Sequence, residues 1–227
     1  MLPIRDTNRP ATAPVLTYLI IAANSFCFLY QLSLPEEELV RFFHDYGMVP
    51  ARLSDLGAEG SLILPALILP IFTSMFLHGG WLHLLGNMWF LHIFGNNVED
   101  AAGKGRFLFF YFACGALANL AQFGLNPESD IPVVGASGAI AGILGAYLVS
   151  WPAARILTIV PIFYFITFIK LPALIVLGLW FVLQLFEGVA SLSGPQAPGG
   201  IAYGAHVAGF IAGMVLIKLM PLKRPPR

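Results

Sequence analysis

The fold of this protein is decided by an uncharged stretch, Ser137–Trp151, which reads SGAIAGILGAYLVSW. The rest of the 227-residue chain has the same character, because 58% of its residues are hydrophobic and only 11% are charged. A soluble domain typically contains about 25% charged residues. A globule of this size cannot bury so much apolar surface, so we expect a polytopic membrane protein with lipid as its main solvent.

The apolar runs predict an all-α membrane protein, built as a bundle of six transmembrane helices. Two further apolar stretches are expected to lie at the membrane interface. Leu62–Leu77 contains two prolines and nearly abuts the next run, and Ile156–Ile169 is short and interrupted by Pro161. The six expected spans are Ala13–Leu34, Gly80–Gly95, Arg106–Leu125, Ser137–Trp151, Leu171–Leu192 and Tyr203–Met220.

The distribution of Lys and Arg sets the expected orientation. With the N-terminus inside, ten of the twelve basic residues fall on the inner side, and only Arg41 and Arg52 fall outside. Since cytoplasmic loops carry the excess of Lys and Arg, we expect both termini to be cytoplasmic. The expected organisation is a tail at 1–12, a membrane domain at 13–220 with a long outer loop at 31–79, and a basic tail at 221–227.

The composition also excludes several function classes. Twelve Lys and Arg balance twelve Asp and Glu, so there is no basic excess for binding nucleic acid. The two cysteines, Cys27 and Cys114, lie in apolar runs and predict neither a disulfide framework nor a cysteine metal site. We expect no metal and no cofactor.

Polar residues in the second expected span form the first candidate site. His83 and Asn87 are four residues apart, so they share one helix face and can direct donors at one point. A structural alternative is that both residues tie helices together by buried hydrogen bonds. Either interpretation explains why polar side chains stand in a segment that lipid should surround.

A serine marks the expected start of the fourth span. Ser137 follows an acidic loop and Pro132, so its hydroxyl should lie at the positive end of a helix, where free N–H groups can stabilise an oxyanion. Gly135 and Gly138 leave room for a substrate backbone to approach. The alternative is an N-cap serine followed by a helix-packing face formed by Gly138 and Gly142.

A histidine opens the sixth expected span. Gly209 and Gly213 share a face with His206, so this helix can pack closely against the glycine-faced helix that starts at Ser137. Such packing would bring His206 against Ser137, although a satisfied core histidine is the alternative. The orientation places these two residues and the second-span pair at one depth. A nucleophile, a base and oxyanion donors together indicate an acyl-transfer site.

These motifs resemble those of the rhomboid family of intramembrane serine proteases. The matching strings are H-x-x-x-N from His83, G-x-S-G from Gly135 and A-H-x-x-G-x-x-x-G from Ala205. A G-x-x-x-E element, Gly95–Glu99, also matches, and the resemblance covers residues 73–213 in the family's order and spacing. The resemblance implies a six-helix rhomboid-like bundle.

The resemblance implies a role for each matched residue. Ser137 would be the nucleophile and His206 its general base. The oxyanion hole would be formed by the Ser137 backbone N–H and the side chains of His83 and Asn87. Supporting positions would be His78, Gly135, Gly138, Gly209 and Glu99, the last as a structural acid at the cytoplasmic end of its helix.

Two departures from the family pattern and the placement of the acids shape the expected mechanism. The family's Trp-Arg pair is missing from the first outer loop, and Ala141 stands where some members have an aromatic that stacks on the base histidine. Glu99 lies about 24 Å along the helix from His83, too deep to orient His206. Glu187 is the one acid at a matching depth, and a direct role for it stays open. We therefore expect a Ser-His dyad and slow turnover.

The expected reaction is peptide-bond hydrolysis in the transmembrane segments of membrane-protein substrates, near the outer leaflet. The Gly- and Pro-rich segment Ser193–Gly200 could move as part of a gate. One alternative is a catalytically silent rhomboid-like protein that binds membrane clients, and another is a small transporter or channel. The expected location is a bacterial cytoplasmic membrane, with the lipid bilayer as partner and the active site open to the outer side.

Overall fold

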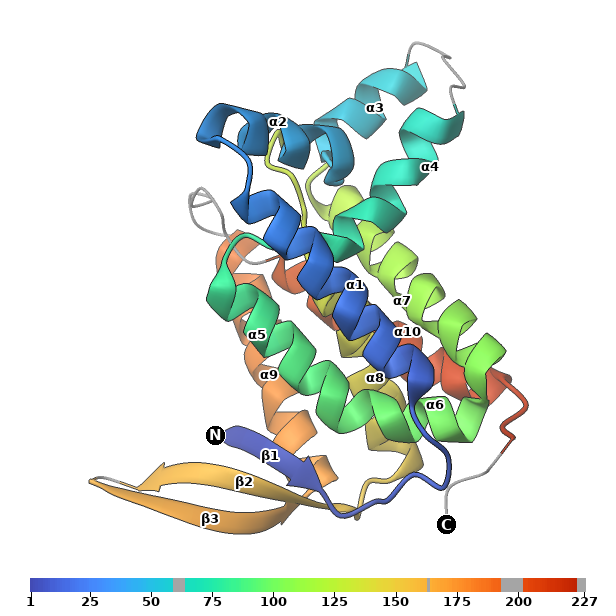
Figure 1. Ribbon diagram of the computed structural model, residues 1–227, viewed down its shortest axis with the longest axis vertical. Helices are drawn as coiled ribbons and strands as arrows, with labels where there is room; N and C mark the ends of the chain where they lie inside the picture. The colour runs from blue at the N-terminus through green and yellow to red at the C-terminus, as the bar shows by residue number, and fades with distance from the viewer. Residues whose placement is uncertain (59–63, 163, 193–201, 224–227) are drawn as a thin grey trace.

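The computed structural model describes residues 1–58, 64–162, 164–192 and 202–223 as a mostly helical bundle with a small sheet at one end (Figure 1). The expected gate, Ser193–Gly200, and the basic tail after Lys223 lie outside the described residues. The α-helices are α1 (Val15–Leu32), α2 (Glu36–Tyr46), α3 (Pro50–Ala58), α4 (Leu64–Thr73), α5 (Trp81–Phe90), α6 (Asn96–Ala102), α7 (Lys104–Leu125), α8 (Ser137–Ser150), α9 (Ala173–Leu192) and α10 (Tyr203–Leu219).

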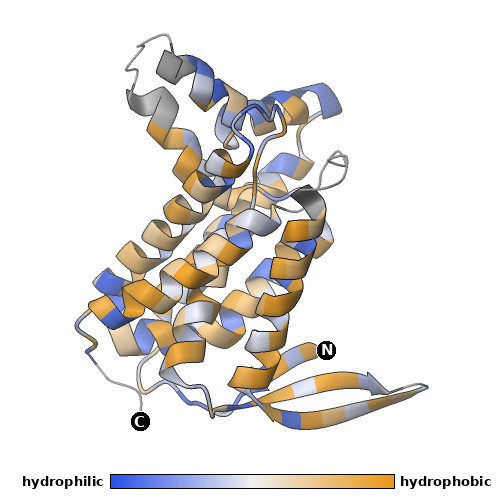
Figure 2. Cartoon of the chain, turned by 180° about the vertical axis from the view of Figure 1, so that it is seen from behind, coloured by the Kyte–Doolittle hydropathy of each residue, from blue (hydrophilic) through white to orange (hydrophobic). Residues whose placement is uncertain are grey.

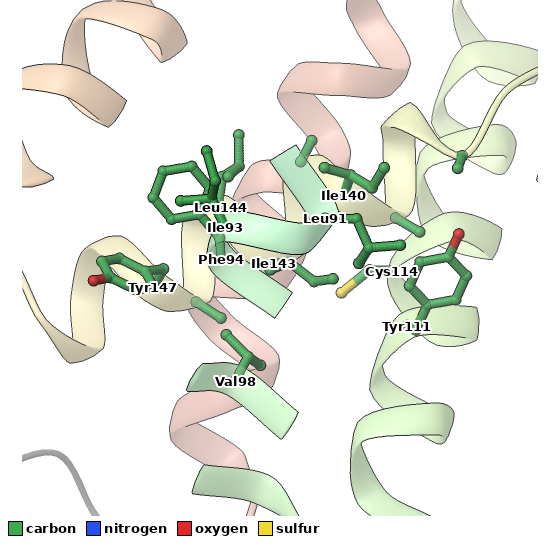
Figure 3. Packing of buried hydrophobic residues seen from close by; sticks show 14 of the residues in the cluster. Leu91, Ile93, Phe94, Val98, Tyr111, Cys114, Ile140, Ile143, Leu144 and Tyr147 are labelled. Atoms are coloured by element: carbon green, nitrogen blue, oxygen red, sulfur yellow. The ribbon is translucent and has the colours of Figure 1, made fainter. Parts of the chain in front are cut away.

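Helix α8 lies at the centre of the bundle. Every residue from Gly138 to Tyr147 is buried, as expected for a helix that is apolar on all sides. Figure 3 shows its large side chains packed against residues from neighbouring helices. The labelled members of this core are Leu91, Ile93, Phe94, Val98, Tyr111, Cys114, Ile140, Ile143, Leu144 and Tyr147.

Glycines bring α8 and α10 into backbone contact. A Cβ atom on Gly209 would overlap the carbonyl oxygen of Gly138, and one on Gly213 would overlap that of Gly142. On the α8 side, a Cβ atom on Gly145 would overlap the carbonyl oxygen of Phe210. The close packing of these two small-residue faces, predicted from the sequence, is therefore present.

Several helices are long and apolar enough to cross a membrane. Within the described residues these are α1, α7 and the Ala173–Ala190 part of α9. The segments Ile68–Phe76 and Trp81–Ala102 pass the same test together, but they meet at an angle of 91°. Helices α8 and α10 are apolar and shorter, with 14 and 17 residues. The chain is thus a multi-helix membrane protein, and the count of six spans stays a prediction.

The second expected span is longer than Gly80–Gly95. Helix α5 continues through a π-helical turn, Leu91–Gly95, into α6, so one helical rod runs from Trp81 to Ala102. Before it, the chain passes through α4 and a 3₁₀ turn, Ser74–Phe76. This is the stretch that the sequence assigns to the membrane interface.

The expectation of an all-α protein was wrong at one end of the bundle. Strands β1 (Leu2–Asp6), β2 (Arg155–Ile162) and β3 (Phe165–Pro172) form an antiparallel sheet in the order β1-β2-β3. Leu2 pairs with Ile159, and Arg155 pairs with Pro172. Residues 155–172 are rich in β-branched and aromatic side chains, which favour strands over helices. The segment Ile156–Ile169 is therefore a β-hairpin, and its position at the membrane interface stays a prediction.

The two ends of the bundle differ. Helices α2 and α3 lie at one end, and the sheet and the C-terminal end of α10 lie at the other (Figure 1). Figure 2 shows that apolar residues dominate the long helices, whereas polar residues are frequent on α2 and α3. The outward side of α9 exposes large apolar side chains, which suits contact with lipid: Leu174, Ile175, Leu179, Val182 and Phe186.

Candidate active site

A cavity of about 1750 Å³ opens between α5, α7, α8, α9 and α10. It is lined by the loop before α8 and by the ends of these helices that lie nearest α2. Two thirds of the site residues expected from the sequence line this cavity. They are His83, Asn87, Gly135, Ser137, Gly138 and His206.

Ser137 is the first residue of α8, and its side chain is half-buried. The N-cap of this helix is Ala136, and no side chain caps it, so the structure does not support the alternative of an N-cap serine. Among the described residues, the Ser137 hydroxyl has no hydrogen-bond partner, and it faces the cavity. Its backbone N–H belongs to the unpaired first turn of a helix, where an anion is stabilised.

Gly135 holds the loop close to both Ser137 and His83. Its φ of +121° is a conformation that favours glycine, and its N–H donates to the carbonyl oxygen of Ser74 at 2.9 Å. A Cβ atom at this position would lie 2.6 Å from His83 Nε2 and 3.6 Å from Ser137 Oγ. Any side chain here would displace the histidine, so the glycine is what allows His83 and Ser137 to approach each other.

His83 directs an N–H donor toward Gly135. Its Nδ1 accepts a hydrogen bond from the Gly79 N–H at 3.4 Å, so in a neutral ring the proton lies on Nε2. Nε2 is the atom that approaches Gly135. One turn later, Asn87 is buried and lines the same cavity, and its side-chain NH₂ has no partner among the described residues. Within the described residues, the cavity wall therefore presents two N–H donors that have no hydrogen-bond partner.

His206 is held by α9. Its Nδ1 lies 2.6 Å from Oε1 of Gln184. The ring of Trp180 lies 6.1 Å from the imidazole centroid, and that of Tyr203 lies 6.3 Å away. These aromatics flank the histidine in a site where Ala141 offers no ring. The base is therefore oriented from α9 and from its own helix rather than from α8.

The sequence did not predict Gln184 as a partner of His206, because the acids are the usual partners of a base histidine and packing and backbone were expected to orient it without one. The available signal was the one amide of α9, placed one turn after Trp180 in a mostly apolar helix. Glu187, one turn further along, is exposed and lines the cavity. Gln184, and not this acid, makes the contact with the imidazole.

The remaining expected residues lie outside the cavity wall. His78 is buried and stacks edge-on against His83, with ring centroids 5.0 Å apart. Its two ring nitrogens have no partner among the described residues, while Gln31 binds its backbone N–H and carbonyl. Gly209 lies at the contact with α8. His78 thus supports the site by packing on a residue that lines it.

Glu99 lies at the end of the bundle opposite the cavity. It is buried, and its carboxylate accepts hydrogen bonds from the N–H groups of Leu16 and Thr17 at 3.0 and 2.8 Å. The Thr17 hydroxyl donates a third at 2.8 Å. The carboxylate thereby caps the first turn of α1, where a negative charge is stabilised. No group of three or more metal-binding side chains is found among the described residues.

Comparison with known proteins identifies the scaffold that carries this cavity. The Rhomboid domain model matches residues 67–222, which include α5 to α10 and every residue named in the cavity wall. The chain belongs to the rhomboid family. The rhomboid match begins within α4, so α1 to α3 precede it.

Three rhomboid relatives show how far the similarity extends. Rhomboid-like protein 11, chloroplastic, of Arabidopsis thaliana is 30% identical over 161 residues, covering 65% of this chain and 51% of that protein. Rhomboid protease GluP of Bacillus subtilis is 38% identical over 140 residues, covering 60% of this chain and 24% of that protein. Presenilin-associated rhomboid-like protein, mitochondrial, of Mus musculus is 27% identical over 182 residues, covering 77% of this chain and 44% of that protein. The chain thus spans about half the length of these relatives or less, and two of them are named for different organelles, the chloroplast and the mitochondrion.

Proposed function

We propose that this rhomboid is an intramembrane serine endopeptidase that cleaves transmembrane segments of membrane proteins near the outer leaflet. One observation carries the proposal: Ser137, at the start of a helix, and His206 face the same cavity as two N–H donors, those of His83 and Asn87, that have no partner within the described part of the chain. A nucleophile, a base and an oxyanion site are the parts that acyl transfer requires.

In the proposed mechanism, Ser137 Oγ attacks the scissile carbonyl and His206 Nε2 accepts its proton. The Ser137 N–H, His83 Nε2–H and Asn87 Nδ2–H stabilise the oxyanion. His206 then returns the proton to the leaving amine, and an acyl-enzyme forms on Ser137. Water, deprotonated by His206, then attacks the acyl carbon. The bond from that carbon to Ser137 Oγ breaks, His206 returns the proton to Oγ, and the acid product leaves. The hydrogen bond from the Ser137 hydroxyl to His206 Nε2 forms when the substrate occupies the cavity.

The substrate must be extended at the cut site, because an intact helix hides its carbonyl groups in internal hydrogen bonds. We propose six spans with both termini on the cytoplasmic side, so that the cavity opens toward the outer leaflet. The positive-inside distribution of Lys and Arg supports this orientation. The acidic helix α2 lies at the cavity end, which suits a position outside the cytoplasm.

The test is labelling of the detergent-solubilised protein with a fluorophosphonate probe, which reacts with activated serines. We expect the wild type to be labelled and both Ser137→Ala and His206→Ala to be unlabelled. Ser150→Ala, at the other end of the same helix, is the matched control and should be labelled like the wild type. If the wild type stays unlabelled while a known active rhomboid reacts, the proposal fails. A catalytically silent protein that binds membrane clients then becomes the better interpretation.

A further inference from the structure

A hydrogen bond across two helices sets the orientation of His206. Gln184 lies on α9 and His206 lies in the first turn of α10, and Oε1 of the amide is 2.6 Å from Nδ1 of the ring. Trp180, one turn before Gln184 on the same face of α9, lies beside the imidazole. Two side chains of one helix, α9, thus lie against the ring.

The identity of the contacting atom decides which ring nitrogen carries the proton. An amide oxygen only accepts hydrogen bonds, so with Oε1 as the contacting atom this hydrogen bond forms in the tautomer of neutral His206 that carries the proton on Nδ1. Nε2 then keeps its lone pair and can accept the proton of Ser137. The opposite tautomer would place a hydrogen on Nε2, and the ring could no longer act as a base toward the serine.

We propose that Gln184 is the positioning residue for His206, holding it in the Nδ1–H tautomer. This inference rests on the proposed function, because it explains how a base without a carboxylate partner is oriented. As His206 takes up the proton of Ser137, its Nδ1–H bond to the amide oxygen becomes charge-assisted and strengthens. A neutral amide gives this support without placing a second charge in a partly buried site.

The test compares three variants of the full-length protein. Gln184→Met keeps the length of the side chain and removes the acceptor, whereas Gln184→Glu keeps an acceptor oxygen. Val182→Ala changes an exposed residue of the same helix outside the cavity wall and is the control. We expect Gln184→Met to lower kcat about 100-fold with KM changed less than about threefold, because the base loses its orientation but substrate contacts remain. Gln184→Glu should recover most of this loss, which a purely structural role would not require.

The tautomer is read directly by ¹⁵N NMR of histidine-labelled protein, with the His206 signals assigned by comparison with His206→Ala. The wild type should show a protonated Nδ1 and a bare Nε2, and Gln184→Met should lose this preference. A wild type with the proton on Nε2 would overturn the inference. So would equal kcat values for Gln184→Met and Val182→Ala.

Failure of the inference and failure of the proposed function give different results. If fluorophosphonate labels the wild type and Gln184→Met at the same rate, only the role of Gln184 is refuted. If the wild type does not react at all, the proposed function fails, and the NMR comparison still decides whether Gln184 sets the tautomer. Thermal unfolding of each variant shows whether it is folded. If Gln184→Met does not fold, the comparison of Gln184→Glu with the wild type remains as the test.

Discussion

Gly138 and Gly209 contact each other through the backbone, since a Cβ atom on Gly209 would overlap the carbonyl oxygen of Gly138. Gly138 follows Ser137 directly, and Gly209 lies three residues after His206. The crossing of α8 and α10 therefore sets the distance between the proposed nucleophile and its base. Widening the crossing by the size of one methyl group would separate them.

Replacing Gly209 by alanine should therefore impair both stability and reactivity. We expect Gly209→Ala to lower the free energy of unfolding by about 1–3 kcal/mol, the usual effect of overpacking, and to slow fluorophosphonate labelling strongly. Gly178→Ala on α9 is the control, because nothing lies within 4 Å of its added Cβ. Thermal unfolding and labelling rates check this prediction, and a Gly209→Ala protein that labels as fast as the control would contradict it.

Removal of either side-chain donor should slow turnover. We expect His83→Ala and Asn87→Ala each to lower kcat by about 10²–10³-fold, the range found when one oxyanion donor is lost. Leu85→Ala is the matched control, since Leu85 is exposed on the same helix and does not line the cavity. Cleavage of a transmembrane reporter measures the effect. Unchanged kcat in both donor variants would assign the two residues to helix packing instead.

Glu99 should contribute to stability and not to chemistry. Glu99→Gln weakens the three hydrogen bonds that cap α1, and we expect a loss of about 1–3 kcal/mol. For a chain of this length each kcal/mol corresponds to roughly 2–4 °C in Tm. Glu37→Gln, on the surface of α2, should leave Tm unchanged. A Glu99→Gln protein with wild-type Tm, or one that folds normally but is unreactive, would refute this assignment.

Asp6 should make stability depend on pH. Burial raises the pKa of its carboxyl from 3.8 to about 6, while the hydrogen bond donated by the Tyr147 hydroxyl at 2.7 Å acts in the opposite direction. The folded protein therefore binds this proton more tightly than the unfolded chain. The stabilising contribution is complete below about pH 4 and is lost as the pH rises through about 6.

The comparison that isolates this group is wild type against Asp6→Asn, which stays uncharged at every pH. We expect the Tm of the wild type relative to the variant to fall by roughly 2–4 °C between pH 4 and pH 7, about 1 kcal/mol for this half-buried side chain. Asp45→Asn, on the exposed surface of α2, should follow the wild type at each pH. A constant difference between wild type and Asp6→Asn would show that Asp6 does not titrate in this range.

The orientation can be tested with single cysteines in a background that lacks Cys27 and Cys114. We expect Glu37→Cys to react with a membrane-impermeant maleimide in intact cells, because α2 lies at the proposed outer end. Arg5→Cys, on β1 at the other end, should react only after the membrane is permeabilised. The reverse pattern, or equal labelling of both, would overturn the proposed topology.

The helices were predictable where the signal is local. The expected spans Ser137–Trp151, Leu171–Leu192 and Tyr203–Met220 each differ by two residues or fewer at either end from α8, α9 and α10. The sheet was not predictable in the same way. Its first strand, Leu2–Asp6, pairs with Ile156–Ile159, about 150 residues later in the chain, and no local pattern in the polar N-terminus indicates that partner.

The amino-acid sequence by itself determined the lipid environment, the helix that starts at Ser137 and the glycine faces that bring α8 and α10 together, since these depend on residues within a few helical turns. Only the tertiary structure decided how His206 is oriented. Gln184 is 22 residues away on another helix, and its amide meets the imidazole because of the angle and rotation at which α9 packs. Packing over long sequence separations selects that rotation, and a short sequence motif does not encode it.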